Sequence, residues 1–489
     1  MRSNFTATGR RPAMQPQADE EEQRNIMNDT YCNPLAIPGI PVSRVALNPE
    51  YRGPWWREFG DPSVIRFKGM YYLFASCAMV WSSPDLIRWQ KHEINLNDVG
   101  WAPAVAEKGG RLYLTASWEG SRIWTAADPL GHWECLGEIR DEKGEHLSWA
   151  DPALFTDADG TMYCYYSLGV NRGLRGVPLC SGDPTRFAAA PTQFFEFNPD
   201  HRWERFGECN QNPYFSHLEG ASMTRHGGRY YLQYSAAGAE WRNYSVGCYV
   251  ADHPLGPFTP QKRNPVLIQR GGMINGCGHN SIVEDEQGRL WCFYTILMRR
   301  FRGLERRIGM DPVRFDKNGE LYVDGPSETP VRIDGTPTGR LLLSAGQPVE
   351  ASSFRAGHEP DLALDNYIRT YYEAAPEDPA PTLTVDLLGK FDVAAVRVIF
   401  HEKLTPHEVL PARFRFLVEG TLDGETWFPL ADCRGKTFDG HIRYETFEPR
   451  SVVKVRLTVT GTPGGQPAGV VDFAVFGNAS EAGYRGEPR

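Results

Sequence analysis

Apolar residues recur along the first two thirds of the chain in a repeated two-strand pattern. Each copy has a polar or aromatic leading residue, a short apolar strand, a turn with glycine and an aromatic-rich second strand; the leading residues are Asp61, Trp101, Asp151, Glu219 and His279. Glycine at a tight turn between two such strands is typical of a β-hairpin. Five hairpins at spacings of roughly 40–70 residues predict a five-bladed β-propeller, since each blade needs about four strands.

The leading residues also predict a site. The first strand of each blade lines the axis of a propeller, so the five leading residues should converge on one end of one cavity. Three of them, Asp61, Asp151 and Glu219, are acids. Carboxylates that share a partly dry cavity repel one another, so at least one should keep its proton near neutral pH. The repeat therefore predicts a general acid.

The pattern changes after about residue 338, where no further copy of the hairpin occurs. Apolar and polar residues then largely alternate, which is typical of a β-sandwich, in residues 382–387, 393–400, 414–419 and 453–459. We therefore predict an all-β protein with a polar N-terminal lead-in at residues 1–28, a propeller at 29–338, a β-sandwich at 339–478 and a polar tail at 479–489.

Composition excludes some classes of function. A net charge of −9 argues against nucleic acid as a partner. No apolar run approaches membrane-spanning length, and the N-terminus has arginines and the acidic run 20–22 in place of an apolar signal segment, so we expect a cytoplasmic protein without a membrane partner. The ten cysteines are scattered singly, which favours reduced thiols.

The residues at the blade starts resemble glycoside hydrolase family 43, a family of five-bladed propellers that hydrolyse glycosidic bonds with inversion. The resemblance covers about residues 33–331 and rests on four motifs in order: Gly60-Asp61-Pro62-Ser63-Val64, Trp149-Ala150-Asp151-Pro152, Leu218-Glu219-Gly220-Ala221 and Gly278-His279-Asn280-Ser281. It implies that Asp61 is the general base, Glu219 the general acid, and Asp151 the residue that orients Glu219 and tunes its pKa. It also implies that His279 helps to hold a central water or a structural calcium ion, and that no cofactor is required.

The chemistry of the residues agrees with this resemblance. Inverting hydrolysis needs two carboxyl groups about 6.5–9.5 Å apart, with a water between one of them and the sugar. Blades one and four are not adjacent, so Asp61 and Glu219 can face each other across the cavity. We predict substrate contacts from Trp101, Trp149, His279 and Arg307. As an alternative, the two tryptophans pack between blades. For Arg307 the alternative is a solvated position on its strand.

The C-terminal segment resembles the discoidin-like, coagulation-factor type C domain, a jelly-roll sandwich, through residues that include 384–387, 418–427 and 473–477. The resemblance of the propeller implies an exo-acting glycosidase, either an α-L-arabinofuranosidase or a β-xylosidase, and the lack of an apolar signal segment favours small soluble oligosaccharides as substrates. Release of galactose or galactofuranose is an alternative of the same family. A carbohydrate-binding propeller without turnover is the non-enzymatic rival, and the sequence leaves homo-oligomer formation open.

Overall fold

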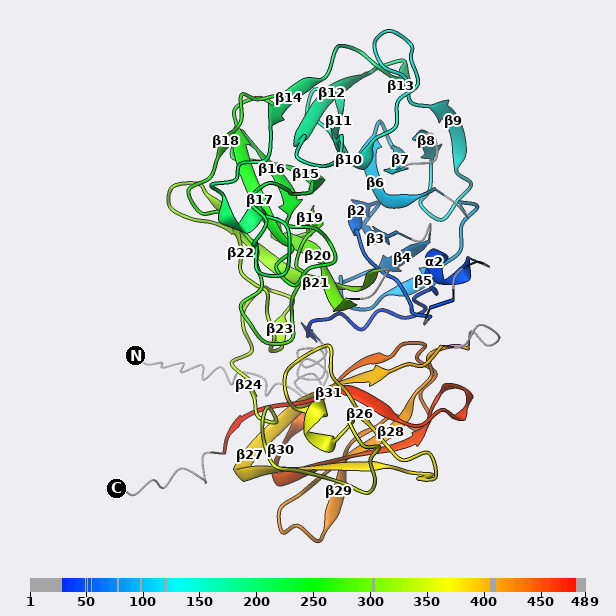
Figure 1. Cartoon of the computed structure of the whole chain (residues 1–489), viewed down its shortest axis with the longest axis vertical. Coiled ribbons are helices and arrows are strands. Elements are labelled where there is room, and N and C mark those ends of the chain that lie inside the picture. Colours follow the sequence, from blue (N-terminus) through cyan, green and yellow to red (C-terminus); the bar gives the residue numbers. More distant parts are fainter. Residues whose placement is uncertain are drawn as a thin grey trace, which may run out of the picture.

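The computed structural model describes residues 29–480, except 49, 51, 54, 77–78, 97–98, 118–120, 301–303 and 405–409. The strands of the described chain form five antiparallel sheets arranged in a ring, a two-stranded sheet, and an eight-stranded sheet that lies beside the first and fifth sheets of the ring (Figure 1). This arrangement confirms the prediction of a five-bladed propeller followed by a β-sandwich. The lead-in predicted at residues 1–28 and residues 481–489 of the predicted tail lie outside the described residues.

Each blade follows the chain outward from the axis, with neighbouring strands hydrogen-bonded in sequence order, except that β14 of the third blade pairs with β12. The first blade has β2 (Ser63–Phe67), β3 (Met70–Phe74), β4 (Val80–Ser83) and β5 (Gln90–His92), and the second has β6 (Trp101–Lys108), β7 (Arg111–Ser117), β8 (Arg122–Ala126) and β9 (Glu134–Glu138). The third has β10 (Ala150–Thr156), β11 (Met162–Ser167), β12 (Leu174–Cys180), β13 (Asp183–Phe187) and β14 (Thr192–Phe195). The fourth has β15 (Leu218–His226), β16 (Arg229–Ala236), β17 (Ser245–Ala251) and β18 (Thr259–Pro260), and the fifth has β19 (Ser281–Glu284), β20 (Leu290–Arg300), β21 (Leu304–Phe315) and β22 (Leu321–Val323).

The start of the described chain is tied to the end of the propeller. Strand β1 (Thr30–Tyr31) pairs with β23 (Val331–Arg332), and the Asn33 side chain accepts from the Met310 amide at 3.0 Å and donates to the Met310 carbonyl at 3.1 Å. The only helices in the described chain are short: α2 (Arg44–Leu47) and the 3₁₀ turns η1 (Arg202–Glu204), η2 (Pro360–Ala363) and η3 (Pro463–Gly465). The start of the chain is therefore held by strand pairing with β23 and by side-chain bonds to the fifth blade.

A residue with left-handed backbone lies within two residues of the start of every inner strand. These residues are Asp61 (φ 53°), Ala102 (φ 50°), Asp151 (φ 47°), Gly220 (φ 59°) and His279 (φ 45°). In the second, third and fourth blades they lie in a β-bulge directly after the residue that pairs with the end of the second strand. The expected alignment of the copies is therefore wrong by one residue in two blades, because Trp101 and Glu219 precede the bulge.

A repeated hydrogen bond between blades holds these left-handed residues. The backbone amide of each donates to a hydroxyl on, or just after, the second strand of the preceding blade: Asp61 to Thr295 (3.2 Å), Ala102 to Ser76 (2.8 Å), Asp151 to Ser117 (2.7 Å) and His279 to Ser235 (2.6 Å). A left-handed non-glycine residue costs about 1–2 kcal/mol. The bond offsets part of this cost and fixes where each side chain enters the axial cavity.

The C-terminal strands form one continuous sheet that folds over itself into a sandwich. They are β24 (Leu341–Leu342), β25 (Val349–Ala351), β26 (Tyr372–Glu373), β27 (Thr382–His401), β28 (Arg415–Thr421), β29 (Trp427–Asp432), β30 (Ile442–Gly461) and β31 (Gly469–Ala479). Strands β27 and β30 each have 20 residues, and irregularities in their pairing let them pass from one layer to the other. The core between the layers contains Val398, Phe400, Phe416, Leu457 and Phe473.

Two expectations about the whole chain can be compared with the structure. All nine cysteines among the described residues are free. None of the helices in the described part of the chain has both the length and the apolar character that crossing a membrane would require.

Candidate active site

The left-handed residues at the starts of the first, third and fifth blades bring two acids and a histidine together. His279 Nδ1 lies 3.3 Å from Asp61 Oδ1 and 3.4 Å from Asp151 Oδ2. Burial lowers the pKa of His279, but the two carboxylates outweigh burial and raise this pKa above its ordinary value. The imidazole therefore joins two of the predicted catalytic acids, as the convergence of blade starts predicts.

Asp61 is held by a buried arginine. Arg306 on β21 donates from Nη1 to Asp61 Oδ1 at 2.5 Å and from Nη2 to Oδ2 at 2.6 Å, and the Ser76 hydroxyl donates to the same carboxylate. Burial acts to raise the pKa of Asp61, but Arg306, then His279 and the Ser76 hydroxyl, lower it to about 2. Asp61 is therefore an ionised carboxylate across the whole physiological pH range.

The Arg306 guanidinium is fixed on its other side by a second acid. Its Nε donates to Glu58 Oε1 at 2.5 Å, and the Arg306 amide donates to Glu58 Oε2 at 3.1 Å. Gly60 makes room for this arrangement, because a Cβ there would lie 2.4 Å from Arg306 Nε. Fork-shaped pairing of this kind fixes orientation as well as charge.

Glu219 lies in the opposite electrostatic state. Burial and the nearby Asp151 carboxylate raise the pKa of Glu219 to about 8. The Tyr244 hydroxyl, which donates to Glu219 Oε1 at 3.0 Å, and His279 act to lower this pKa, but their effect is smaller. His217 Nδ1 is 4.0 Å from Glu219 Oε2, and burial lowers the pKa of His217. Glu219 is therefore protonated at neutral pH.

Asp151 acts on both His279 and Glu219. Its Oδ1 accepts from the Ser117 hydroxyl at 3.1 Å, its Oδ2 lies against His279, and its charge is the second-largest cause of the raised Glu219 pKa. This placement agrees with the role of orienting and tuning Glu219 that the resemblance implies.

Two residues predicted to contact substrate, Trp149 and Arg307, are buried against other parts of the protein. Trp149 is buried between the second and third blades, where its ring lies 5.6 Å from that of Tyr166 and its Nε1 donates to the Ala116 carbonyl. Arg307 is 2% exposed and points toward the sandwich, where its Nε donates to His441 Nε2. Side chains alternate between the two faces along β21. Because Arg306 points toward Asp61, its neighbour Arg307 points to the opposite face, toward His441. Trp101 is half-buried and precedes the second bulge, and its substrate contact stays a prediction.

Sequence reasoning missed Arg306, Ser76, Tyr244 and Glu58. Two glycines of the motifs point indirectly to these residues, because each leaves room for a large side chain. Gly60 leaves room for Arg306, and Gly278 for Tyr244, whose ring would lie 2.2 Å from a Cβ at Gly278. A glycine at such a place shows that something packs closely against the backbone, but it does not say which residue does so.

A polar cavity of about 100 Å³ continues along the axis beyond His279. It is lined by the residues that follow each bulge, among them Ser63, Ser222, Asn280 and Ser281. Among the described residues no cluster of three or more His, Cys, Asp or Glu side chains could hold a metal, and calcium takes about 6–8 oxygen ligands. The calcium contact expected of His279 therefore stays a prediction that needs water as the bridging ligand.

Comparison with known proteins shows which family the chain resembles. Residues 51–321, more than half of the chain, match the sequence model of Glycosyl hydrolases family 43. A beta-D-galactofuranosidase of Aspergillus niger is 26% identical over 361 residues, which are 63% of this chain and 91% of that protein. An arabinoxylan arabinofuranohydrolase of Paenibacillus polymyxa is 29% identical over 36% of this chain and 32% of that protein. A solved thermostable family-43 glycoside hydrolase covers 61% of this chain and 97% of its own, with 26% identity and a TM-score of 0.49. The chain therefore belongs to glycosyl hydrolases family 43, a family of inverting glycosidases.

Proposed function

We propose that this glycosidase is exo-acting and releases terminal pentose units, arabinofuranose or xylose, from oligosaccharides. The observation that carries the catalytic part is the opposite protonation of two carboxyl groups: the pKa of Asp61 is lowered to about 2 and that of Glu219 is raised to about 8. Between these values one group can take a proton and the other can give one.

The proposed reaction is a single displacement. A water attacks the anomeric carbon from the side opposite the leaving group, and Asp61 accepts the proton that this water loses. Glu219 gives its proton to the glycosidic oxygen as the carbon–oxygen bond breaks. The sugar leaves with inverted configuration, and exchange of protons with solvent restores an ionised Asp61 and a protonated Glu219.

The names of relatives support the choice of sugar. A xylosidase/arabinosidase of Humicola insolens is 27% identical over 46% of this chain, and the relative from Paenibacillus polymyxa is named for arabinose release. Galactofuranose is the second candidate, because the Aspergillus niger galactofuranosidase is similar over 91% of its own length. Arabinofuranose and galactofuranose share the five-membered ring, so one pocket shape could separate both of them from xylose.

A panel of aryl glycosides tests the proposal. We expect hydrolysis of the α-L-arabinofuranoside or the β-D-xyloside in preference to the β-D-galactofuranoside and β-D-galactoside, with proton NMR showing that the inverted anomer appears first. Preferred cleavage of the galactofuranoside would replace the pentose assignment by the second candidate. Release of the retained anomer would contradict Asp61 as a base that acts through water.

The pH profile should report Glu219 and its dependence on Asp151. We expect kcat/KM to fall as pH rises through about 8, because Glu219 then loses the proton that it must donate. In Asp151→Asn the negative charge that raises the Glu219 pKa is gone, so this alkaline limb should move to lower pH and kcat should fall by about 10–100-fold. Profiles of both proteins on one substrate measure the shift. An unchanged alkaline limb would show that Asp151 does not tune Glu219.

A further inference from the structure

Two short segments form the wall that holds the general base. The Arg306 amide and guanidinium bind Glu58, and Arg307 Nη1 donates to the Arg57 carbonyl at 2.8 Å, so residues 57–58 and 306–307 lie side by side. Neighbouring residues of an extended chain point to opposite sides. Glu58 and Arg306 therefore face Asp61, whereas Arg57 and Arg307 face the sandwich. We call these four residues the clamp wall.

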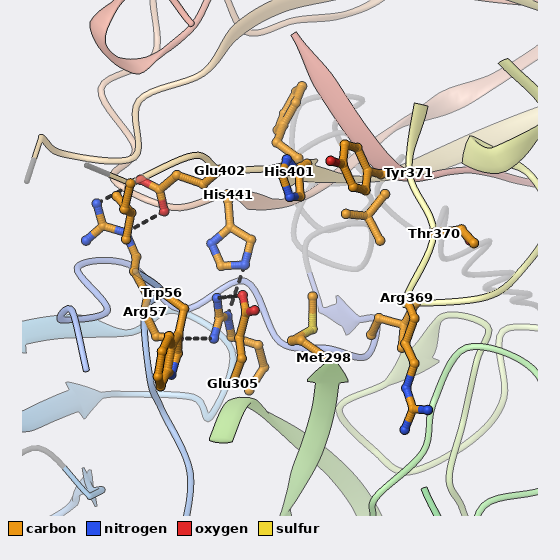
Figure 2. Close-up of a pocket in the computed structure, with 15 residues that line it drawn as sticks. Trp56, Arg57, Met298, Glu305, Arg369, Thr370, Tyr371, His401, Glu402 and His441 are labelled. Atoms are coloured by element: carbon orange, nitrogen blue, oxygen red, sulfur yellow. Dashed lines mark hydrogen bonds and ion pairs between the residues drawn. The ribbon is translucent and has the colours of Figure 1, made fainter. Parts of the chain in front are cut away.

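The sandwich binds the outer side of the clamp wall through buried polar contacts. Glu402 accepts from Arg57 Nε at 2.7 Å and from Arg57 Nη2 at 2.9 Å, and the Leu410 carbonyl accepts from the same guanidinium. His441 Nε2 accepts from Arg307 Nε at 3.0 Å. Figure 2 shows Arg57, Glu402 and His441 around a small pocket that lies between the two parts of the protein.

The sandwich is packed firmly against this region. Along β27, Val396, Val398 and Phe400 point into the core of the sandwich, whereas Ile399 packs with Met298 and Ile274 of the propeller. Ile442 on β30 and Val471 on β31 join the same propeller-facing cluster. A sheet buried on both faces is not a tethered module, so its contacts with the clamp wall are permanent.

We propose that Glu402 and His441 of the sandwich are positioning residues for the general base, which hold Arg57 and Arg307 so that Arg306 stays on Asp61. The inference rests on the proposed catalytic role of Asp61 and deepens it. A catalytic group must be held to within about 0.5 Å of its productive position, and supporting contacts from behind supply this precision. The clamp wall has the active site on one side and the sandwich on the other, so the sandwich provides the support.

Kinetics of four variants test the proposal. Glu402→Gln removes the charge that holds Arg57, and His441→Leu removes the acceptor of Arg307; we expect kcat to fall about tenfold in each, with KM changed less than about twofold. The acid limb of kcat/KM should start at a pH about one unit higher, because a looser Arg306 lowers the Asp61 pKa less. His441→Gln keeps an acceptor near the Nε2 position and should retain most of kcat.

Asp472→Asn is the matched control, since it weakens the buried Asp472–Arg397 pair. Arg397 of this pair donates to the Asn33 carbonyl, away from the clamp wall. This variant should lower the melting temperature without moving kcat or the acid limb.

The variants leave in place every group that sets the charge around Asp61: Arg306, His279, Ser76 and, across the guanidinium, Glu58. The charged and titratable groups that line the same pocket also stay, namely Arg57, Glu305, Arg307, Arg369, Tyr371 and His401. A shifted acid limb would therefore report the position of Arg306 and not a change in the groups beside Asp61.

Amide hydrogen exchange supplies a readout that does not need activity. Glu402→Gln and His441→Leu should speed exchange in peptides that cover residues 56–61 and 305–308, and Asp472→Asn should not. Unchanged kcat, acid limb and exchange in the first two variants would overturn the proposal, as would equal effects of Asp472→Asn. A wild-type protein that cleaves nothing on the glycoside panel would count against the proposed function, while the exchange data would still decide whether the sandwich holds the clamp wall.

Discussion

Replacing Glu219 with glutamine is expected to lower kcat on an unactivated oligosaccharide by about 10²–10⁴-fold, the range that a positioned general acid contributes. Glutamine has nearly the size of glutamate and its oxygen can still accept from the Tyr244 hydroxyl, but it has no acidic proton for the leaving oxygen. A dinitrophenyl glycoside of the same sugar needs no such proton and should lose much less activity. Steady-state kinetics on both substrates measure the difference.

Although Glu219→Gln should lower activity, we expect it to raise stability. The pKa of Glu219 is about 8 in the folded protein and returns to about its ordinary 4.5 on unfolding, so the folded state binds the extra proton between these values. The free energy of unfolding that Glu219 contributes is therefore lost as pH rises from 4.5 through 8. We expect the melting temperature of Glu219→Gln to rise relative to wild type over this interval.

Glu204→Gln is a matched control for Glu219→Gln. Glu204 is another buried glutamate that accepts from a tyrosine hydroxyl, that of Tyr234 at 2.6 Å, but it binds His201 in place of the catalytic residues. This variant should lose stability and keep kcat/KM. Near-normal turnover of the oligosaccharide by a folded Glu219→Gln protein would show that another group is the acid.

Replacing Asp61 with asparagine is expected to lower kcat by a similar factor on every substrate, because the base acts on the water and not on the leaving group. The dinitrophenyl glycoside should therefore lose as much activity as the oligosaccharide, which separates this variant from Glu219→Gln. Kinetics on the same two substrates give the comparison. Activity that returns with the better leaving group would contradict Asp61 as the base.

Stability should also report the ionised state of Asp61. Its pKa is about 2 in the folded protein and near 3.8 when unfolded, so the ionised carboxylate stabilises the fold above pH 3.8 and this contribution is lost as pH falls through 2. Asp61→Asn should therefore melt lower than wild type at neutral pH, with a gap that closes in acid. Asp285→Asn is the matched control: Asp285 is buried, binds Arg289 at 2.6 Å and also has a lowered pKa, but it lies away from the site. It should lose stability and keep kcat.

The sequence by itself determined the blades and the acids. Hairpins with glycine turns recur five times because each blade must bury the same two faces, so the fold class and the number of blades could be predicted. The convergence of Asp61, Asp151 and His279 followed from the same repeat, because equivalent positions of a ring face one axis. Changes in the period of apolar residues likewise predicted a second, sandwich-like part.

Tertiary structure decided which neighbours those acids meet. Nothing in a repeat distinguishes Arg306 from Arg307, because only the register of β21 turns one toward Asp61 and the other toward His441. The bulge placed Ala102 and Gly220, not Trp101 and Glu219, at the equivalent positions, because backbone conformation and not residue polarity sets the blade start. Trp149 is buried between blades, and Tyr244 reaches Glu219 from a segment outside the repeat. The protonation states of Asp61 and Glu219 depend on burial and on these long-range contacts, so the division of labour between base and acid is a property of the folded chain.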